Sequence, residues 1–267
     1  MNRCMYCIFV ATLLSSCQKS SPERMIGTYV GWFKKTDSAA RAAARDNKIN
    51  ITIEAVERNT MRGRSIVAGN ERPFTGTFTA QGEYFQVNAA EPGDDRYDGS
   101  FSFLVKPAEG ILIGSWIPNK PTATVTRTEY TLNRTEFTYN PDRDLPRSLN
   151  WFALYNEDAS RLHDIDFGGE LLTEDVSRFN ASKVLLKKED VENMHKGDLE
   201  VLRNSIYARH GYSFKRRKMR YVFDQIDWYV PVATDVRDQL TDLEQKNIAL
   251  IKRYEEHAAA YYDSFGR

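Results

Sequence analysis

Five side chains in the C-terminal third of the chain could form a site for an anion. Two guanidinium groups and an imidazole lie close together in sequence, with aromatic residues near them. A guanidinium pair with aromatic neighbours suits a carboxylate or phosphate group. In the structural alternative, the aromatic side chains pack in a core and the cations compensate the negative end of a helix. The set comprises Arg203, Tyr207, Arg209, His210 and Tyr229.

A strongly basic segment follows directly. Its five cations fall within the six residues 215–220, namely Lys215, Arg216, Arg217, Lys218 and Arg220. The whole chain has 37 basic and 37 acidic residues, so the imbalance is local. It predicts contact with an anionic surface, such as lipid head groups or lipopolysaccharide phosphates. The alternative is a solvated turn balanced by Asp224 and Asp227.

Motifs of known catalytic chemistry are missing from the sequence. There is no G-x-S-x-G turn, no H-E-x-x-H pair and no phosphate-binding loop. His163, beside Asp164 and Asp166, could be a fragment of a metal site or triad, but its place in a loop favours a plain polar turn. An acidic turn lacks the spacing of a calcium loop; its residues are Glu91, Asp94, Asp95 and Asp98. We therefore expect no catalysis, no metal and no cofactor.

The first residues have the layout of a secretory signal. Arg3 precedes an apolar run that ends near Leu14, and small residues lead to Cys17. The run is too short to span a membrane as a mature helix. The chain has 3 cysteines, at positions 4, 7 and 17, so the remainder forms no disulfide. The sequence predicts a signal peptide over 1–16 and a tether over 17–25.

The residues Leu14-Ser15-Ser16-Cys17 resemble the lipobox of bacterial lipoproteins. The resemblance implies that the Cys17 thiol receives a diacylglycerol and that cleavage makes Cys17 the new N-terminus. Acyl chains such as palmitate would then hold the protein stably on a membrane. Gln18 implies sorting to the outer membrane, facing the periplasm or the surface. An ordinary cleaved signal is the alternative.

Residues 26–139 read as an antiparallel β domain, because apolar residues alternate and turn residues punctuate them. We expect about eight strands, and a short helix over 38–45. Closure into an up-and-down barrel would remove unpaired edges, and a sandwich is the alternative. Such a barrel resembles the lipocalins in outline, with either an apolar pocket or a filled interior. The expected strands are 27–34, 48–57, 63–69, 73–80, 83–90, 99–106, 110–117 and 124–134.

Residues 140–184 read as a linker and connecting elements, since proline and charge concentrate at 140–149. Helical signals follow. Asp198 could cap a helix that ends at Gly211, and Thr241 with Glu244 forms a capping box for a second helix. The apolar faces of these helices are expected to pack together, with aromatic residues of 221–229 between them.

The run from Arg203 to Phe214 contains the letters YARHG and resembles the YARHG domain, a bacterial envelope module. The likeness continues through Trp228, Asn247 and Tyr254, which places a small helical domain at 185–257. The resemblance implies an extracytoplasmic location and brings no established activity.

Together these features predict an α+β multidomain protein, a β-barrel followed by a helical domain. Zero net charge argues against nucleic acid as a partner. We expect a membrane-tethered bacterial lipoprotein that acts as a non-catalytic binding or structural module, with an anionic envelope lipid or polymer as a possible partner. The alternatives are an enzyme that acts on cell-wall material through Arg209 and His210, and a carrier of a small apolar ligand.

Overall fold

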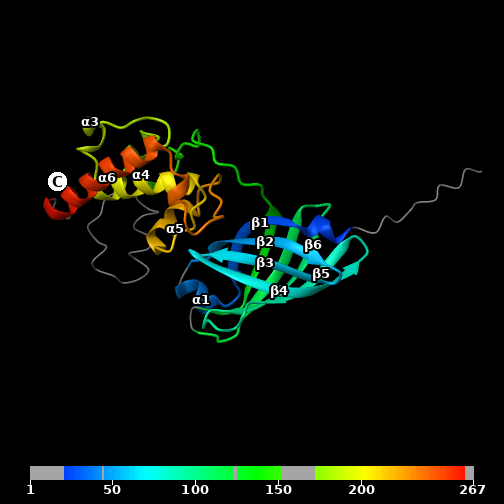
Figure 1. Cartoon of the computed structure of the whole chain (residues 1–267). Helices are drawn as coiled ribbons and strands as arrows, with labels where there is room; N and C mark the ends of the chain where they lie inside the picture. Colours follow the sequence, from blue (N-terminus) through cyan, green and yellow to red (C-terminus); the bar gives the residue numbers. More distant parts are fainter. Residues whose placement is uncertain (1–20, 44, 123–124, 152–171, 262–267) are drawn as a thin grey trace, which may run out of the picture.

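The computed structural model describes residues 21–43, 45–122, 125–151 and 172–261. The lipobox and His163 lie outside the described residues. The chain forms a β-barrel followed by a helical domain, which lie end to end (Figure 1). We found no described helix that is long and apolar enough to cross a membrane.

Eight antiparallel strands close the barrel in sequence order, with the last strand paired to the first. The expected fold class is confirmed. The strands are β1 Gly27–Lys35, β2 Asn47–Glu57, β3 Thr60–Val67, β4 Asn70–Gln81, β5 Tyr84–Ala90, β6 Gly99–Lys106, β7 Ile111–Pro118 and β8 Thr128–Arg134. A 3-10 helix η1 (Pro22–Met25) precedes β1, and helix α1 (Ser38–Ala43) lies between β1 and β2.

The β3–β4 turn differs from the sequence expectation. The strands extend to Val67 and from Asn70, so that Ala68 and Gly69 alone form the turn. Both residues have positive φ angles, 52° and 74°, as two-residue hairpin turns of this hand require. The expected strand 63–69 therefore ends two residues early, because the turn conformation excludes its last two residues from pairing.

The barrel interior is packed at the end where β1 begins, which we call the base. Met25 fills this end of the barrel and is 0% exposed. The inward-facing residues Ile51, Ile53 and Phe85 are equally buried. Alternation along each strand directs these side chains inward. We call the opposite end, where β1 ends and β2 begins, the mouth.

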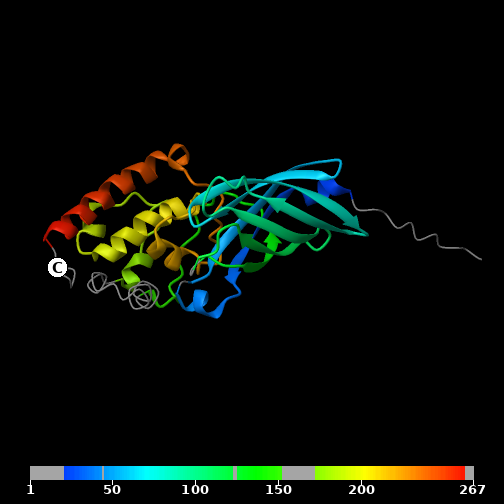
Figure 2. The ribbon, with the colours of Figure 1, turned by 90° about the horizontal axis from the view of Figure 1, so that it is seen from below.

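The helical domain packs around two helices, α4 (Lys196–Arg209) and α6 (Asp242–Tyr261), which contact one another as expected (Figure 2). Leu202, Ile206 and Ile251 are fully buried between elements of this domain. Its core also includes Leu145 and Trp151, from the segment that leads out of the barrel. The shorter elements are η3 Glu174–Ser177, α3 Lys188–Val191, α5 Arg217–Phe223 and η4 Arg237–Gln239.

Asp198 does not cap its own helix. Helix α4 begins at Lys196 with His195 at the N-cap position. Asp198 instead accepts hydrogen bonds from the backbone nitrogen (2.6 Å) and the hydroxyl (2.9 Å) of Thr173, which itself caps η3. The carboxylate thus joins two segments that are distant in sequence.

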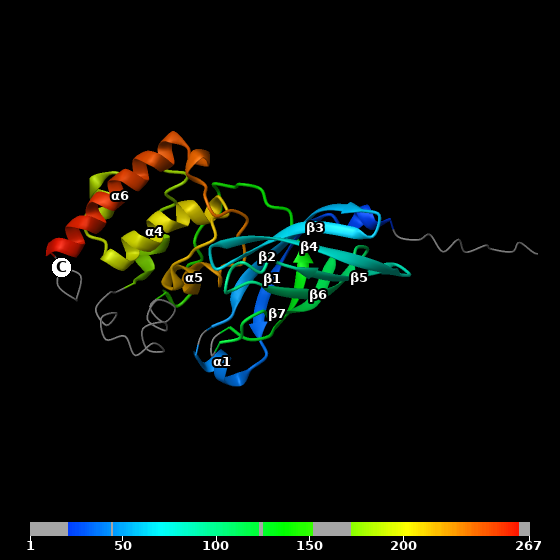
Figure 3. The ribbon, with the colours of Figure 1, turned by 60° about the horizontal axis from the view of Figure 1, so that its bottom comes forward.

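Helix α5 faces the mouth of the barrel (Figure 3). Side chains on both sides of this junction hydrogen-bond to the other domain. The contacts are Asn50 Nδ2 to the carbonyl oxygen of Pro231 (2.9 Å), Ser213 Oγ with the backbone nitrogen of Gly69 (3.0 Å), and Arg220 Nε to Asn47 Oδ1 (2.9 Å). The two domains are therefore joined through specific polar contacts.

Candidate functional site

A cavity of about 410 Å³ opens at the mouth, between the barrel and α5. Its volume falls in the range of roughly 300–1,000 Å³ that is common for small-molecule sites. The cavity has apolar walls and a polar rim. Its apolar lining includes Phe33, Ile49, Val67, Phe101 and Trp116.

The alternation of inward-facing residues explains why this end of the barrel is not sealed. Residues that face the interior at the base are apolar, whereas polar residues are interspersed with apolar ones at inward positions near the mouth. A polar group inside a barrel needs a partner, and Ser65, Arg72 and Glu91 find theirs along the barrel wall, beside the open space. The polar residues at inward positions are Lys35, Ser65, Arg72, Glu91 and Thr128.

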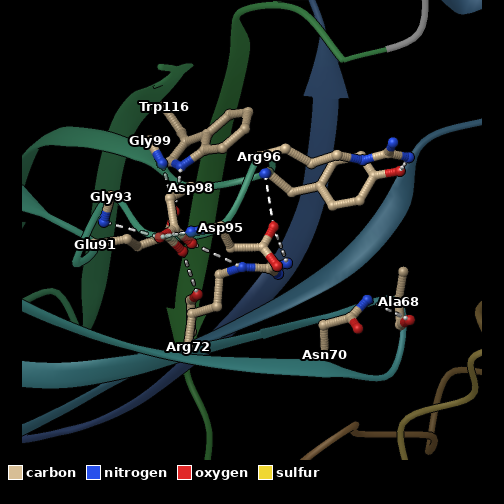
Figure 4. A network of polar contacts seen from close by, with 12 residues as sticks. Ala68, Asn70, Arg72, Glu91, Gly93, Asp95, Arg96, Asp98, Gly99 and Trp116 are labelled. Atoms are coloured by element: carbon tan, nitrogen blue, oxygen red, sulfur yellow. Dashed lines mark hydrogen bonds and ion pairs between the residues drawn. The ribbon is translucent and has the colours of Figure 1, made fainter. Parts of the chain in front are cut away.

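Glu91 forms the centre of a polar network on one wall of the mouth (Figure 4). Its carboxylate accepts hydrogen bonds from Trp116 Nε1 (3.1 Å), the Gly99 nitrogen (2.7 Å) and Ser65 Oγ (3.1 Å). Burial raises the pKa of Glu91, although these three donors act in the opposite direction. The carboxylate thus fixes the positions of three strands around the cavity.

Asp98 extends the same network. It is 1% exposed and accepts from the nitrogen of Gly93 (2.8 Å), the nitrogen of Asp95 (3.1 Å) and Arg72 Nε (3.1 Å). Burial acts to raise the pKa of Asp98, but these contacts outweigh it and lower the pKa. The acidic turn noted in the sequence therefore has a structural role, because its carboxylates hold the Arg72 side chain in place (Figure 4). Within the described residues, no group of three or more histidine, cysteine or acidic side chains could hold a metal ion.

The basic segment 215–220 lies across the mouth. Lys215, Arg217 and Arg220 line the cavity. Lys218 is buried with its Nζ 4.0 Å from Glu200, and Arg216 extends outward and forms an ion pair with the same carboxylate. Three of the five predicted surface cations thus face the barrel mouth.

The predicted anion site at the YARHG letters is dispersed in the structure. Arg203 forms a two-bond ion pair with Glu255 at 2.7 and 3.1 Å. The Tyr229 hydroxyl donates to the carbonyl oxygen of Tyr212 at 2.7 Å, and Tyr207 packs near the Tyr212 ring. These side chains are engaged in contacts within the domain and do not converge on a common cleft.

Arg209 fastens the segment that leads out of the barrel. It is 2% exposed, and its Nε donates to the carbonyl oxygen of Arg143 (2.7 Å) while Nη1 donates to Ser205 Oγ (2.8 Å). Its guanidinium lies over the Trp228 ring, 5.7 Å from the ring centre. Burial lowers the pKa of Arg209 to about 10, although Asp144 and Glu244 oppose the shift.

His210 pairs with a carboxylate that is buried with it. Its Nε2 lies 2.8 Å from Glu244 Oε2, and the two side chains are 2% and 0% exposed. The Tyr139 ring stacks on the imidazole at 4.2 Å, and the Tyr139 hydroxyl donates to the other Glu244 oxygen at 3.2 Å. Burial acts to raise the pKa of Glu244, but hydrogen bonds from His210, Ser182 and Thr241 lower it to about 2. The pair joins the end of α4 to the start of α6 and to the outgoing segment.

Gly211 completes the motif. Its φ angle is +75°, and an added Cβ would lie 3.0 Å from the Phe137 ring. A glycine is needed there to end α4 in the left-handed region, as the sequence predicted. The residues of the YARHG motif thus join three segments: the end of α4, the start of α6 and the segment that leads out of the barrel.

Sequence reasoning left open an apolar pocket in the barrel, but it did not identify the residues that line the cavity at the mouth. Its polar residues stand on different strands, and barrel closure brings them together. One signal was present: Lys35, Arg72 and Glu91 occupy positions that continue the inward alternation of apolar residues.

Comparison with curated proteins finds no match to the chain. Comparison with protein families finds the YARHG domain at residues 176–256. The matched range contains α4, α5 and α6 up to Glu256, and it starts before Leu185, where the sequence resemblance was placed. It includes the basic segment and the His210–Glu244 pair, whereas Tyr139 and Arg143, which contact Glu244 and Arg209, lie before it. The part of the helical domain that spans residues 176–256 is therefore a YARHG domain, and the barrel that precedes it lies outside the matched range.

Proposed function

We propose that the protein is a lipid-anchored, non-catalytic binding protein of the bacterial envelope, and that it binds at the mouth of the barrel. The observation that carries the proposal is the cavity of about 410 Å³ that the YARHG domain's basic segment borders. A lined space between two domains, with apolar walls and a few polar groups, is a common form of ligand site.

The polar groups of the described residues favour binding over catalysis. A general acid or base must reach the proton that it transfers. The buried His210–Glu244 pair offers a substrate no such access, since the side chains are 2% and 0% exposed. Glu91 is occupied by three hydrogen bonds that hold the barrel wall. These observations do not favour the enzyme alternative.

The packed base does not favour a carrier that fills the whole barrel. Met25, Phe85 and Ile53 are each 0% exposed there. The space for a ligand is therefore confined to the half of the barrel nearest α5.

The first described residues and the cavity lie at opposite ends of the barrel. Helix η1, which forms the last four residues of the predicted tether, lies at the base with Met25 buried, whereas α5 lies at the mouth (Figure 1). Lipid on Cys17 would hold the base nearest the membrane and leave the mouth directed away from it. We place the protein at the outer membrane, because Gln18 follows the cysteine.

The anchor can be tested by mass spectrometry of the mature N-terminus and by membrane fractionation. We expect a diacylglyceryl mass on Cys17, and a Cys17→Ala variant that leaves the membrane fraction. A Cys7→Ala variant is the matched control, because Cys7 lies inside the predicted signal. Wild-type protein without acyl mass, together with a membrane-bound Cys17→Ala variant, would show that the proposed anchor is wrong.

A further inference from the structure

We propose that the barrel mouth binds a small amphipathic anion, with a carboxylate or phosphate head group at Lys215 and Arg217 and a single apolar chain against Phe33, Phe101 and Trp116. The inference rests on the proposed binding function and specifies its ligand. It is carried by three properties of the cavity: its available cations, its unpartnered hydroxyls and its apolar wall.

The charge of the lining favours an anion. The cavity is bordered by five cations and one carboxylate, although the chain as a whole has no net charge. Three of these cations are engaged by the protein. Arg72 bonds to Asp98, Lys35 lies 3.8 Å from Asp46, and Arg220 bonds to Asn47.

The other two cations are available to a ligand. Within the described parts of the chain, no hydrogen bond or ion pair engages the side chains of Lys215 and Arg217. Arg217 is only half-exposed. The carboxylate in the lining, that of Glu91, and the carboxylate of Asp98 next to the lining already accept hydrogen bonds from other donors. A partly desolvated guanidinium binds a carboxylate or phosphate more strongly than an exposed one does, because the contact is less screened by water.

Two buried hydroxyls that have no hydrogen-bond partner among the described residues line the same cavity. Thr128 is 5% exposed, and its Oγ1 has no hydrogen-bond partner in the described part of the structure. The buried Oγ1 of Thr126 is also unpartnered among described residues. A buried hydroxyl without a partner costs free energy that a bound polar group would recover. Both threonines therefore offer further hydrogen bonds to a head group.

The apolar wall distinguishes an amphiphile from a simple ion. Phe33 packs against Trp116 with a ring separation of 5.6 Å, and Phe101 lies beside them in the lining. Ile49 and Val67, which pair across β2 and β3, belong to the same apolar lining. Inorganic phosphate would leave this surface uncovered, whereas an alkyl chain would remove it from water.

The recessed position of the cavity favours a free amphiphile over a lipid in a flat bilayer. The cavity lies between the barrel and α5, where Arg217 is half-exposed, and the outward-directed Arg216 is paired with Glu200. A head group that remained in a membrane surface would not reach the inward-facing residues of the barrel.

Calorimetric titration of the full-length Cys17→Ala chain with decanoate tests the proposal without dependence on acylation. We expect decanoate to bind, and decyltrimethylammonium, which has the same chain and the opposite charge, to bind at least tenfold more weakly. Decyl phosphate should bind as decanoate does. Inorganic phosphate alone and vesicles of phosphatidylglycerol serve to separate ion binding and membrane binding from capture of a single amphiphile.

Substitutions of residues in the lining test whether decanoate binds in the cavity. Arg217→Gln should weaken decanoate binding about tenfold, because one charge-assisted contact is lost. Arg216→Gln is the matched control and should leave it unchanged, since Arg216 lies outside the lining. Val67→Phe should block binding by filling the apolar part, and circular dichroism checks that each variant is folded.

Four outcomes would overturn the proposal: no decanoate binding, equal binding of the cationic amphiphile, equal binding of inorganic phosphate, or binding to vesicles alone. Equal losses in Arg216→Gln and Arg217→Gln would also contradict it. An unacylated Cys17 refutes the anchor and leaves these titrations valid, so the two proposals fail independently.

Discussion

Lys48 of β2 is bound to the loop that carries Tyr229 in the YARHG domain. Its Nζ donates to the carbonyl oxygens of Tyr229 (2.8 Å) and Ile226 (3.1 Å), and it lies 5.4 Å from the centre of the Tyr229 ring. Burial lowers the pKa of Lys48, while Asp224 and Asp227 oppose the shift. One side chain thus connects the mouth of the barrel to the core of the second domain.

Replacement of this lysine should weaken the junction. We expect Lys48→Met to lower the free energy of unfolding by about 2 kcal/mol, because two carbonyl groups lose a charged donor. Denaturant unfolding measures this loss. Lys34→Met on the exposed side of β1 is the control and should change stability by less than about 0.5 kcal/mol. Equal effects of the two substitutions would contradict the assigned contact.

The turn at Gly69 should tolerate no side chain, because the YARHG domain lies against it. An added Cβ would lie 2.7 Å from the backbone nitrogen of Lys215. Gly69→Ala should therefore cost more than the roughly 1–2 kcal/mol of a left-handed alanine. Gly82 has a similar φ angle of +65° and nothing within 4 Å of an added Cβ, so Gly82→Ala measures the backbone cost alone. The difference in denaturation midpoints reports the packing of the domains, and identical midpoints would mean that they do not touch there.

The buried His210–Glu244 pair should stabilise the helical domain. Glu244→Gln removes the charge that His210, Thr241 and Tyr139 face, and we expect a loss on the order of 3 kcal/mol. Glu256→Gln on the same helix should have little effect, since Glu256 is 69% exposed. Thermal or chemical unfolding distinguishes the two variants.

The contribution of Glu244 should also depend on pH. Its pKa is about 2 in the folded protein against an ordinary value of 4.5, so the stabilisation is present above pH 4.5 and disappears as the pH falls toward 2. The stability difference between wild type and Glu244→Gln should therefore shrink over this range. A difference that stays constant with pH would argue against an ionised Glu244.

Asp198 should have the opposite pH dependence. Burial raises its pKa from 3.8 to about 6, against hydrogen bonds from Thr173 that lower it. Folded protein then retains a proton that unfolded protein releases, so stability falls as the pH rises from about 4 to about 6. Asp198→Asn should flatten this decline in denaturation curves, since an amide keeps an acceptor for Thr173 and carries no charge. Parallel pH profiles of wild type and variant would contradict the assignment.

The barrel strands were predictable because each is a local pattern. Ile49, Ile51 and Ile53 alternate along β2, and all three are buried as that alternation requires. The YARHG letters and the capping box at Thr241 were equally readable, because they depend on residues that are near one another in sequence. The box is present, with Glu244 accepting from the Thr241 nitrogen at 3.0 Å.

The cavity could not be predicted in the same way. Its formation requires β8 to pair with β1 and α5 to dock on the mouth, and both contacts join residues that are far apart in sequence. Asp198 shows the same limitation: local spacing indicated a cap, but its partner Thr173 comes from a remote segment. Arg217 was recognised as basic, while its orientation toward the barrel depended on the docking of two domains.

The base of the barrel is secured to its first residues in a way that has a mechanical consequence. Arg134 at the end of β8 donates to the carbonyl oxygen of Arg24 at 3.0 Å, and the Tyr29 hydroxyl donates to that of Met25 at 3.0 Å. A force pulling on the chain before Pro22 would be transmitted to the seam between β1 and β8. The mouth lies a strand's length away, at the other end of the barrel, so such a force would act first on the base.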